Sequence, residues 1–388
     1  MSFLKMNILI YFENKINRTH GGTERAAENL AQALTLQGHK IYYLYKYESD
    51  FETSFSSYRL PSHDECAVEN ANYVETIVKT LGIDVIINEG GNTSDVQMLN
   101  HENVRVSCKI ITCLHFCPFQ GFDSVWQDVR VTCFHDLLSL LKAPINRFRA
   151  IQRFKDNYLT AIRHTDAFVV LSASFVEDVI QIVGDESVKT KIKVIPNINS
   201  YSIQNLSLEK KENRLLYIGR LQYQTKRVDR LLKAWSLNNL DNNCVLDILG
   251  DGPDREYYEK ISKRLGLKNV VFHGFQDPLE FYKKAKIIAL TSTHESFGMT
   301  LIEGMANGCV PIVFNSYATA SEIVTNGVDG VTIKPYDIQE FSRQIALIMK
   351  DNDVFMKLAK NARKNVVRYD ESAIMPQWNS LYSALDLI

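Results

Sequence analysis

Short runs of apolar residues recur along the chain and alternate with stretches in which apolar residues repeat at helical spacing. The runs are rich in β-branched and aromatic side chains, which is typical of strands in a parallel sheet buried on both faces. The first half predicts strands at residues 8–11, 41–45, 85–87, 109–113 and 168–171. The second half predicts strands at residues 215–218, 245–249, 270–272, 287–290, 310–314 and 331–333. Strands that alternate with helices in this way predict α/β domains built from βαβ units.

The length of 388 residues is large for a single core and favours two such domains. Residues 197–212 are polar, follow neither period and are typical of a linker. We therefore expect doubly wound, Rossmann-like domains at residues 1–197 and 198–370, with ligand crevices at the carboxyl ends of the strands facing each other across an interdomain cleft. Residues 371–388 have helical spacing, and the pattern leaves open which domain this helix packs on, the first included.

The charge of the chain is nearly balanced, with 44 basic and 45 acidic residues and a formal net charge of −1. No global field attracts a nucleic acid, so we expect no nucleic-acid partner. No run reaches the roughly 18 apolar residues that a bilayer span requires, and the N-terminus does not resemble a signal peptide. The seven cysteines are odd in number and lie mostly in apolar runs, as reduced thiols do. These features predict a cytoplasmic protein.

Glu295 and Glu303 lie in the segment after the predicted strand at residues 287–290. Glu295 comes just past the carboxyl end of that strand, where the crevice of such a sheet lies. Gly298 precedes a helical pattern that begins at Met299, and the free N–H groups of a helix N-terminus form an anion site. Acceptors for hydroxyls on both sides of an anion site suit a nucleotide sugar, which carries hexose hydroxyls, a diphosphate and ribose hydroxyls. From the residues alone, a helix whose charges are merely solvated stays an alternative.

The match to a known family lies in residues 295–312, which read ESFGMTLIEGMANGCVPI. This segment resembles the Glu-x7-Glu signature of the retaining glycosyltransferases of family 4, whose GT-B architecture has two facing Rossmann-like domains. The resemblance implies that Glu295 faces the donor sugar and that Glu303 binds ribose. It also implies that the turn between them contacts the sugar and phosphate through Phe297, Gly298, Met299 and Thr300.

Two cations beyond the predicted strand at residues 215–218 extend the resemblance. Arg220 and Lys226 match the Arg and Lys with which the family holds the donor diphosphate. Two cations at a strand end also neutralise a leaving diphosphate without a metal ion. Arg227 departs from the family, which has a Gly after the Lys. When each of these two residues is considered alone, the alternative interpretation is an ordinary surface residue whose charge is solvated by water.

Three glycine turns match further features of the family. Gly252 lies in a Gly-x-Gly-Pro turn and Phe275 in a His-Gly-Phe turn, and both turns border the nucleotide in the family. Gly22 lies in a Gly-Gly loop of the kind the family places near the diphosphate and the acceptor, and Thr23 is a candidate N-cap of the helix that follows. Read alone, such turns need glycine only for backbone reasons. A Gly-x-Gly-x-x-Gly dinucleotide motif is absent, which weighs against a dehydrogenase.

His115 follows the predicted strand at residues 109–113, again at a crevice position. The family commonly has a His in that place, close to the donor sugar. There a neutral imidazole hydrogen-bonds a hydroxyl or supports the positive charge that develops during reaction. His135 is a competing candidate, and a lone His is more often structural.

The sequence predicts no metal site. Asp351 and Asp353 form the one Asp-x-Asp, at an apparent helix start, where capping explains them. Cys113 and Cys117 have no second pair or His cluster at zinc spacing. We therefore expect no metal and no cofactor apart from the nucleotide-sugar substrate.

The resemblance implies transfer of a hexose-type sugar from a nucleoside-diphosphate sugar to a hydroxyl acceptor, a glycan or lipid-linked saccharide. Transfer would retain the anomeric configuration and use no enzymic nucleophile, with Glu295, His115, Arg220 and Lys226 as the catalytic set. The basic, aromatic residues 146–155 are compatible with peripheral contact at the inner face of the cell membrane, or with a packed helix whose basic face is solvated. A nucleotide-sugar 2-epimerase on the same fold and a non-catalytic sugar-nucleotide-binding protein are the alternatives.

Overall fold

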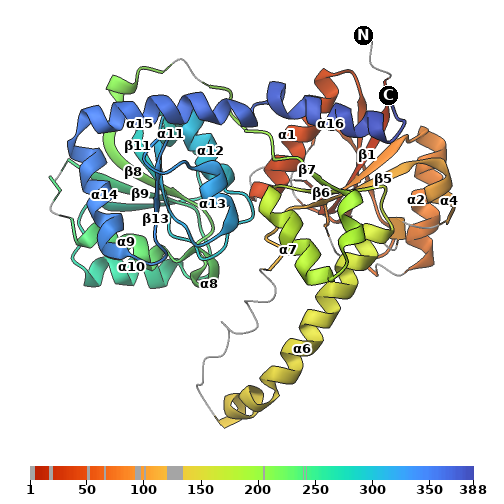
Figure 1. Cartoon of the computed structure of the whole chain (residues 1–388), viewed down its shortest axis with the longest axis horizontal. Helices are drawn as coiled ribbons and strands as arrows, with labels where there is room; N and C mark the ends of the chain where they lie inside the picture. The colour runs from red at the N-terminus through yellow and green to blue at the C-terminus, as the bar shows by residue number, and fades with distance from the viewer. Residues whose placement is uncertain are drawn as a thin grey trace. The chain divides into compact units, whose positions relative to one another are not determined.

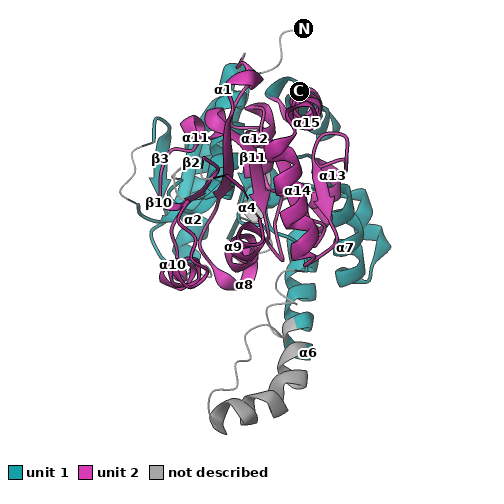
Figure 2. Cartoon of the chain, turned by 90° about the vertical axis from the view of Figure 1, so that its left-hand side faces the viewer, with its two compact units in different colours: residues 1–198, 371–388 teal, residues 199–370 magenta. Residues whose placement is uncertain are grey.

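The computed structural model describes most of the chain and leaves out residues 1–4, 17–20, 50–52, 65–66, 92–97, 100–101, 120–133, 204–205, 239 and 242. Inside helices, the side chains of residues 102–103, 106, 134–147 and 150 are also outside the description. The chain divides into two compact units (Figure 2). The first comprises Met1–Ile198 together with Glu371–Ile388, and the second comprises Asn199–Asp370. The chain therefore returns to the first unit for its last helix.

The first unit is built on a parallel sheet whose described strands run in the order β3-β2-β1-β4-β5-β6-β7. These strands are β1 (Asn7–Asn14), β2 (Lys40–Tyr47), β3 (Ser56–Arg59), β4 (Val85–Asn88), β5 (Lys109–Leu114), β6 (Ala167–Val170) and β7 (Ile192–Val194). From β1 the strands proceed outward to β3, and the chain then returns to place β4 on the other side of β1. The carboxyl ends of β1 and β4 therefore flank the point at which a doubly wound sheet opens its crevice.

Helices cover both faces of this sheet (Figure 1). They are α1 (Gly22–Leu36), α2 (Val68–Leu81), α4 (Glu102–Ser107), α6 (Phe134–Arg163), α7 (Ala173–Val183), the 3-10 helix η1 (Glu186–Thr190) and α16 (Glu371–Ala384). Side chains alternate along β1, so that Ile8 and Ile10 join one core while Leu9 and Tyr11 join the other. Residues of α1 and α16 complete the first core, and residues of α2 complete the second.

The C-terminal helix α16 belongs to the first unit. Its side chains Ile374, Trp378 and Leu381 are buried and share a core with Ile8 of β1 and Leu34 of α1. The spacing of apolar residues did not predict which domain this helix packs on. The contacts in the core show that it packs on the first unit.

The second unit repeats the architecture, with a parallel sheet whose described strands run in the order β10-β9-β8-β11-β12-β13. The strands are β8 (Glu212–Ile218), β9 (Val245–Leu249), β10 (Val270–Gly274), β11 (Ala285–Leu290), β12 (Val310–Phe314) and β13 (Val331–Ile333). The helices are η2 (Leu208–Lys210), α8 (Tyr223–Lys226), α9 (Val228–Ser236), α10 (Arg255–Arg264), α11 (Leu279–Lys284), α12 (Met299–Ala306), α13 (Ala318–Ile323), α14 (Ile338–Lys350), α15 (Asn352–Asn365) and η3 (Val366–Tyr369). Here the order reverses between β8 and β11.

The strands predicted in both halves are confirmed, and two further strands were not predicted. β3 reads SSYR and is half exposed, and β7 reads IKV with two exposed residues, so neither shows a buried apolar run. The prediction of Thr23 as an N-cap is wrong. Gly21 occupies the N-cap position of α1 in an extended conformation without a side-chain hydrogen bond, and Thr23 lies within the first turn.

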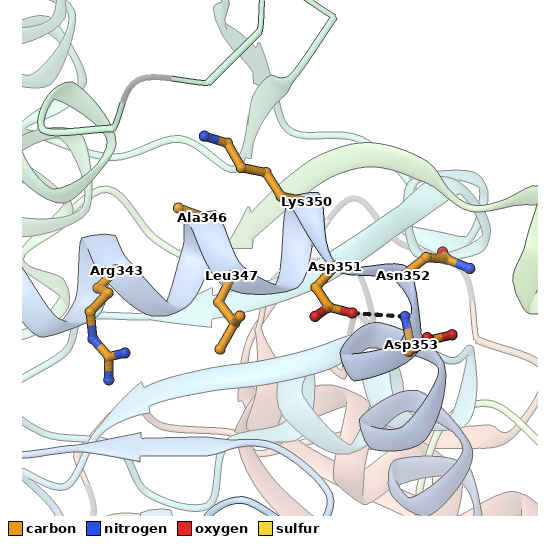
Figure 3. Close-up of a pocket in the computed structure, with 7 residues that line it drawn as sticks. All are labelled: Arg343, Ala346, Leu347, Lys350, Asp351, Asn352 and Asp353. Atoms are coloured by element: carbon orange, nitrogen blue, oxygen red, sulfur yellow. Dashed lines mark hydrogen bonds between the residues drawn. The ribbon is translucent and has the colours of Figure 1, made fainter.

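Asp351 caps α15, as the sequence predicted. Its Oδ1 accepts hydrogen bonds from the backbone N–H groups of Asp353 and Val354, both at 3.0 Å. Figure 3 shows this contact beside the hollow that Arg343 and Leu347 help to line at the junction of α14 and α15. The carboxylate of Asp351 is therefore engaged with its own helix.

The cysteines that the structure describes are buried and form no disulfide bond with one another, namely Cys108, Cys113, Cys117, Cys244 and Cys309. Cys66 and Cys133 lie outside the described residues. None of the helices in the described part of the chain combines the length and apolar character needed to cross a bilayer.

Candidate active site

The polar residues predicted in the second unit gather at the reversal point of its sheet. Arg220 follows β8 and Glu295 follows β11, and these two strands are parallel neighbours. Their carboxyl ends therefore lie at the same edge, where doubly wound sheets bind ligands. The guanidinium of Arg220 is exposed and forms no ion pair with any residue that the structure describes.

The loop that carries Arg220 is held by the Gly250–Gly252 turn. Gly250 has φ +126°, and a Cβ there would lie 2.1 Å from the carbonyl oxygen of Gly219. A Cβ on Gly252 would lie 2.5 Å from the carbonyl oxygen of Leu221. Only glycine permits this backbone contact, which explains the Gly-x-Gly pattern on steric grounds. The half-buried Gly252 thus shapes the crevice through its backbone.

Tyr217 also positions the loop after β8. Its hydroxyl donates a hydrogen bond of 3.4 Å to the carbonyl oxygen of Arg220. Burial, with a smaller contribution from the charge of Glu295, raises the pKa of Tyr217 well above its ordinary value. The phenol therefore keeps its proton and acts as a donor.

Lys226 and Glu295 are brought into direct contact. Nζ of Lys226 donates to Oε1 of Glu295 at 2.6 Å, and the hydroxyl of Ser292 donates to the same oxygen at 2.7 Å. The side chains of Lys226 and Glu295 are 23% and 10% exposed, so the pair lies near the surface of the unit. A cation and a hydroxyl acceptor are thereby placed next to each other in one crevice.

Two threonines after β11 hold the segment that carries Lys226 against the loop that carries Glu295. The backbone N–H of Thr293 donates to the carbonyl oxygen of Thr225 at 2.8 Å, and its hydroxyl donates to that of Gln224 at 3.0 Å. The hydroxyl of Thr291 donates to the carbonyl oxygen of Arg227 at 3.0 Å. Residues 224–227 and the loop after β11 therefore form one hydrogen-bonded surface.

Arg227, the departure from the family pattern, sits where glycine is easiest to accommodate. Its φ of +48° and ψ of +46° lie in the left-handed region, which side chains rarely adopt. The guanidinium bonds both carboxylate oxygens of the buried Asp229 at 3.0 Å, and it lies 4.4 Å from the centre of the Tyr223 ring. These contacts offset the backbone strain, so the turn keeps its shape without glycine.

The turn predicted to bind the donor, residues 297–300, includes the N-terminus of α12. Gly298 occupies the N-cap position with φ +91° and provides no side-chain cap. Phe297 and Met299 are buried, and the ring of Phe297 meets that of Tyr369 edge to face at 5.4 Å. Thr300 is half buried. Phe297 and Met299 thus anchor the turn, and an uncapped N-terminus is suited to an anion.

Glu303 lies inside the unit rather than at its surface, with an exposed fraction of 0%. The hydroxyl of Ser200 donates to its Oε1 at 2.7 Å, and the hydroxyl of Tyr282 donates to its Oε2 at 2.8 Å. Both donors come from distant parts of the chain, and neither was predicted. Hydroxyl groups are therefore the natural partners of this carboxylate.

Phe275 follows the turn at the end of β10 and is 60% exposed. This turn joins the glycine turn after β9, because the backbone N–H of Gly250 donates to the carbonyl oxygen of Gly274 at 2.7 Å. His273 contacts Asp247 through Nε2 at 2.8 Å. The backbone beside Phe275 therefore lies at the same edge of the sheet as Arg220.

In the first unit, His115 follows β5 and its Nε2 pairs with Oε2 of Glu89, which follows β4. Gly22 is exposed and begins α1, which comes after β1. His135, the competing candidate, has a side chain outside the described residues. Glu89 was not predicted, although its place at the end of a strand that neighbours β1 is a crevice position that its sequence could have revealed.

In the described part of the chain, one set of three side chains has its potential metal-ligand atoms close enough together to hold a metal ion. The ligand atoms of Glu89, Cys113 and His115 lie within 4.8 Å of one another, so Cys113 has a His neighbour that its sequence spacing did not reveal. Burial, and to a smaller extent the charge of Glu89, raises the pKa of Cys113 well above its ordinary value. A metal ion bound by this group would have to displace the proton of the Cys113 thiol.

Comparisons with known proteins agree with this geometry. Residues 201–365 match the family described as glycosyl transferases group 1. An uncharacterized glycosyltransferase of Methanocaldococcus jannaschii is 32% identical over 216 residues, which cover 51% of this chain and 54% of that protein. The chain therefore spans about half the length of that relative. The amylovoran biosynthesis glycosyltransferase AmsD of Erwinia amylovora is 25% identical over 366 residues, or 93% of this chain and 95% of that protein.

Solved structures share the fold of the whole chain. The structure of HepE from Anabaena in complex with UDP has a TM-score of 0.75 at 19% identity, over 98% of this chain and 100% of that one. The predicted GT-B architecture, with two Rossmann-like parallel-sheet domains, is thereby confirmed. Arg220, Lys226, Glu295 and Glu303 therefore lie within the residues that match the model described as glycosyl transferases group 1, in a chain of GT-B fold.

Proposed function

We propose that the protein is a retaining glycosyltransferase that moves a hexose-type sugar from a nucleoside-diphosphate sugar to a hydroxyl acceptor in polysaccharide or glycolipid biosynthesis. The observation that carries the proposal is the Lys226–Glu295 contact at 2.6 Å, at the same edge of the second sheet as the exposed Arg220 and at the point where the strand order reverses. These residues combine cations for a diphosphate with an acceptor for sugar hydroxyls. Nucleotides and other phosphate-bearing ligands are typical of the crevice at this edge of a doubly wound sheet.

Lys226 exchanges partners when the donor binds. Its ammonium forms an ion pair with Glu295. A donor diphosphate would bond Lys226 and the exposed Arg220, and Glu295 would then be free to accept hydrogen bonds from the sugar. As the bond to the sugar breaks, charge grows on the diphosphate, and the two cations stabilise it in place of a metal ion.

Glu303 binds ribose in this proposal. Its carboxylate already accepts from two hydroxyls, those of Ser200 and Tyr282. A ribose hydroxyl that replaces Ser200 restores the same kind of contact, so the exchange leaves no buried charge unpaired. Phe275 and the Gly252 turn would border the nucleotide, and Gly22 the diphosphate.

Retention follows if the departing diphosphate accepts the proton of the attacking hydroxyl on the same face of the sugar. No enzymic nucleophile is assigned, and His115 supports the sugar while charge develops. The transfer requires no metal or other cofactor in this proposal, because Arg220 and Lys226 provide the positive charge.

The acceptor is a glycan or a lipid-linked saccharide, and contact with a membrane would be peripheral, at its cytoplasmic face. Residues 146–155 lie within α6, where Phe148 is 69% exposed beside the exposed Arg149. An apolar ring next to a cation is a combination suited to the headgroup region of a bilayer.

A thermal-shift screen against UDP-, GDP-, ADP- and dTDP-sugars identifies the donor, because a ligand of the native state raises the melting temperature. With that donor, Arg220→Ala should lower the rate of transfer by about 10²-fold or more, the scale of losing a charge-stabilising contact. Arg264→Ala, which removes an exposed arginine at the end of α10, is the matched control.

Three results would contradict the proposal. A near-native rate for Arg220→Ala would place the diphosphate elsewhere. Conversion of the donor to its 2-epimer in the absence of an acceptor would indicate an epimerase, and the absence of donor turnover for every donor that binds would indicate a binding protein.

A further inference from the structure

Glu89 is a buried carboxylate at the crevice edge of the first unit. It directly follows β4 and is 3% exposed. Its partner His115 follows β5, and β4 and β5 pair in parallel with Asn88 opposite Thr112. Both side chains therefore lie just beyond the carboxyl ends of neighbouring strands, at the edge where doubly wound sheets take their ligands, and there they contact each other.

The contact decides which nitrogen of His115 carries the hydrogen. Nε2 of the imidazole faces Oε2 of Glu89, and a carboxylate can only accept hydrogen bonds. Nε2 must therefore be protonated, since the other tautomer would set two lone pairs against each other. In a neutral ring, Nδ1 is then left as a hydrogen-bond acceptor.

Nδ1 of His115 is buried and has no hydrogen-bond partner among the residues that the structure describes. A buried polar atom without a partner costs about 1–3 kcal/mol, which makes such an atom a place for a missing ligand or water. His115, Glu89 and Cys113 also line a cavity of about 20 Å³. A cavity of that size holds about one water molecule.

We propose that Glu89 is a positioning residue that holds His115 in the Nε2–H form, so that Nδ1 accepts a hydrogen bond from a hydroxyl of the sugar substrate. Its role in turnover rests on the proposed function, whereas the state of the ring does not. A substrate with a carboxylate at that position would be disfavoured, because a carboxylate cannot donate to Nδ1.

The ring state is tested by nitrogen NMR of the full chain labelled with ¹⁵N-histidine, with the His115 signals assigned by their loss in His115→Gln. The expected spectrum shows a protonated Nε2 and an unprotonated Nδ1. In Glu89→Ala the carboxylate that selects this tautomer is gone, so the Nδ1–H form should become populated. Glu69→Gln removes an exposed carboxylate on α2 and should leave the His115 signals unchanged.

The role in turnover is tested with Glu89→Gln, which keeps the size of the side chain and removes its charge. We expect kcat to fall by about 10²-fold, the scale of losing a group that orients a catalytic ligand or base. The affinity for the free nucleotide should stay within about twofold, because nucleotide binding belongs to the second unit. Glu89→Asp should recover part of the loss.

Three results would overturn the proposal. They are an Nδ1–H tautomer in the wild-type protein, a native kcat in Glu89→Gln and Glu89→Ala, and one equivalent of zinc bound by the purified chain. If the ring has the expected tautomer but no donor supports transfer, the proposed function fails and the Glu89–His115 assignment stands. If transfer proceeds and Glu89→Gln is as fast as the wild type, the proposed function stands and the role of Glu89 in turnover fails.

Discussion

Lys226 and Glu295 are separated by 69 positions in sequence and meet through a hydrogen bond of 2.6 Å. Each was predicted from its place beyond a strand end, and the resemblance gave each a role. Their direct contact was not predicted, because it depends on the backbone bonds of Thr291 and Thr293 to residues 224–227. Residue types and strand ends therefore identify the members of this site, and packing determines how they pair.

Glu295 and Glu303 should differ in what their loss changes. Glu295→Gln removes the acceptor nearest to the proposed sugar and should lower kcat by about 10²-fold with a small change in donor KM. Glu303→Gln should raise donor KM by about tenfold, the scale of one hydrogen bond to a charged group, and leave kcat less affected. Steady-state kinetics of the two variants measure this split. Equal effects of both variants on kcat would contradict the assigned roles.

Three polar residues at or near the sites were missed by sequence reasoning. Glu89, Ser200 and Tyr282 contact His115 or Glu303 across gaps of 26, 103 and 21 positions, respectively. Ser200 and Tyr282 lie within stretches that give no periodic signal for such a contact. Only the strand-end position of Glu89 could have marked it in advance.

At the scale of elements, the buried strands were predictable, whereas the two edge strands of the first sheet were not. The interior strands β8, β11 and β12 are apolar over most of their length, because neighbours cover both of their faces. β3 and β7 lie at the two edges of the first sheet, are short and carry polar or exposed residues. An edge strand needs no apolar run, so the sequences of β3 and β7 resemble those of loops.

The turns between elements also shape the site, and Gly250 tests this. Gly250→Ala forces a Cβ to within 2.1 Å of the Gly219 carbonyl oxygen, so the loop that carries Arg220 must shift. We expect a loss of about 3 kcal/mol in unfolding free energy from backbone strain and overpacking together, with weaker nucleotide binding.

Gly266→Ala is the matched control for that variant. Gly266 also has a positive φ, +66°, but its Cβ would meet nothing within 4 Å, so only the strain of about 1 kcal/mol remains. Denaturant unfolding and nucleotide titration of both variants measure the difference. If the two variants lost stability equally and bound nucleotide like the wild type, the turn would have no part in shaping the crevice.

For the whole molecule, two α/β domains followed from the pattern, but the place of the last helix did not. The apolar face of α16 fits any core of suitable shape, and only three-dimensional packing assigned Trp378 and Leu381 to the first unit. The GT-B fold followed from the resemblance together with the alternation of strands and helices. Sequence patterns of this kind do not predict individual interatomic contacts, such as the one between Nε2 of His115 and Glu89.

Sugar transfer with retention, in which Arg220 and Lys226 carry the charge that a metal ion would otherwise neutralise, is the activity that we propose for this protein. Proton NMR of the full chain turning over its donor and acceptor in excess EDTA tests it most directly, because one experiment reports both the rate and the anomeric configuration. We expect undiminished transfer in EDTA and a product with the anomeric configuration of the donor. An inverted product, or a rate that EDTA abolishes and Mg²⁺ restores, would contradict it.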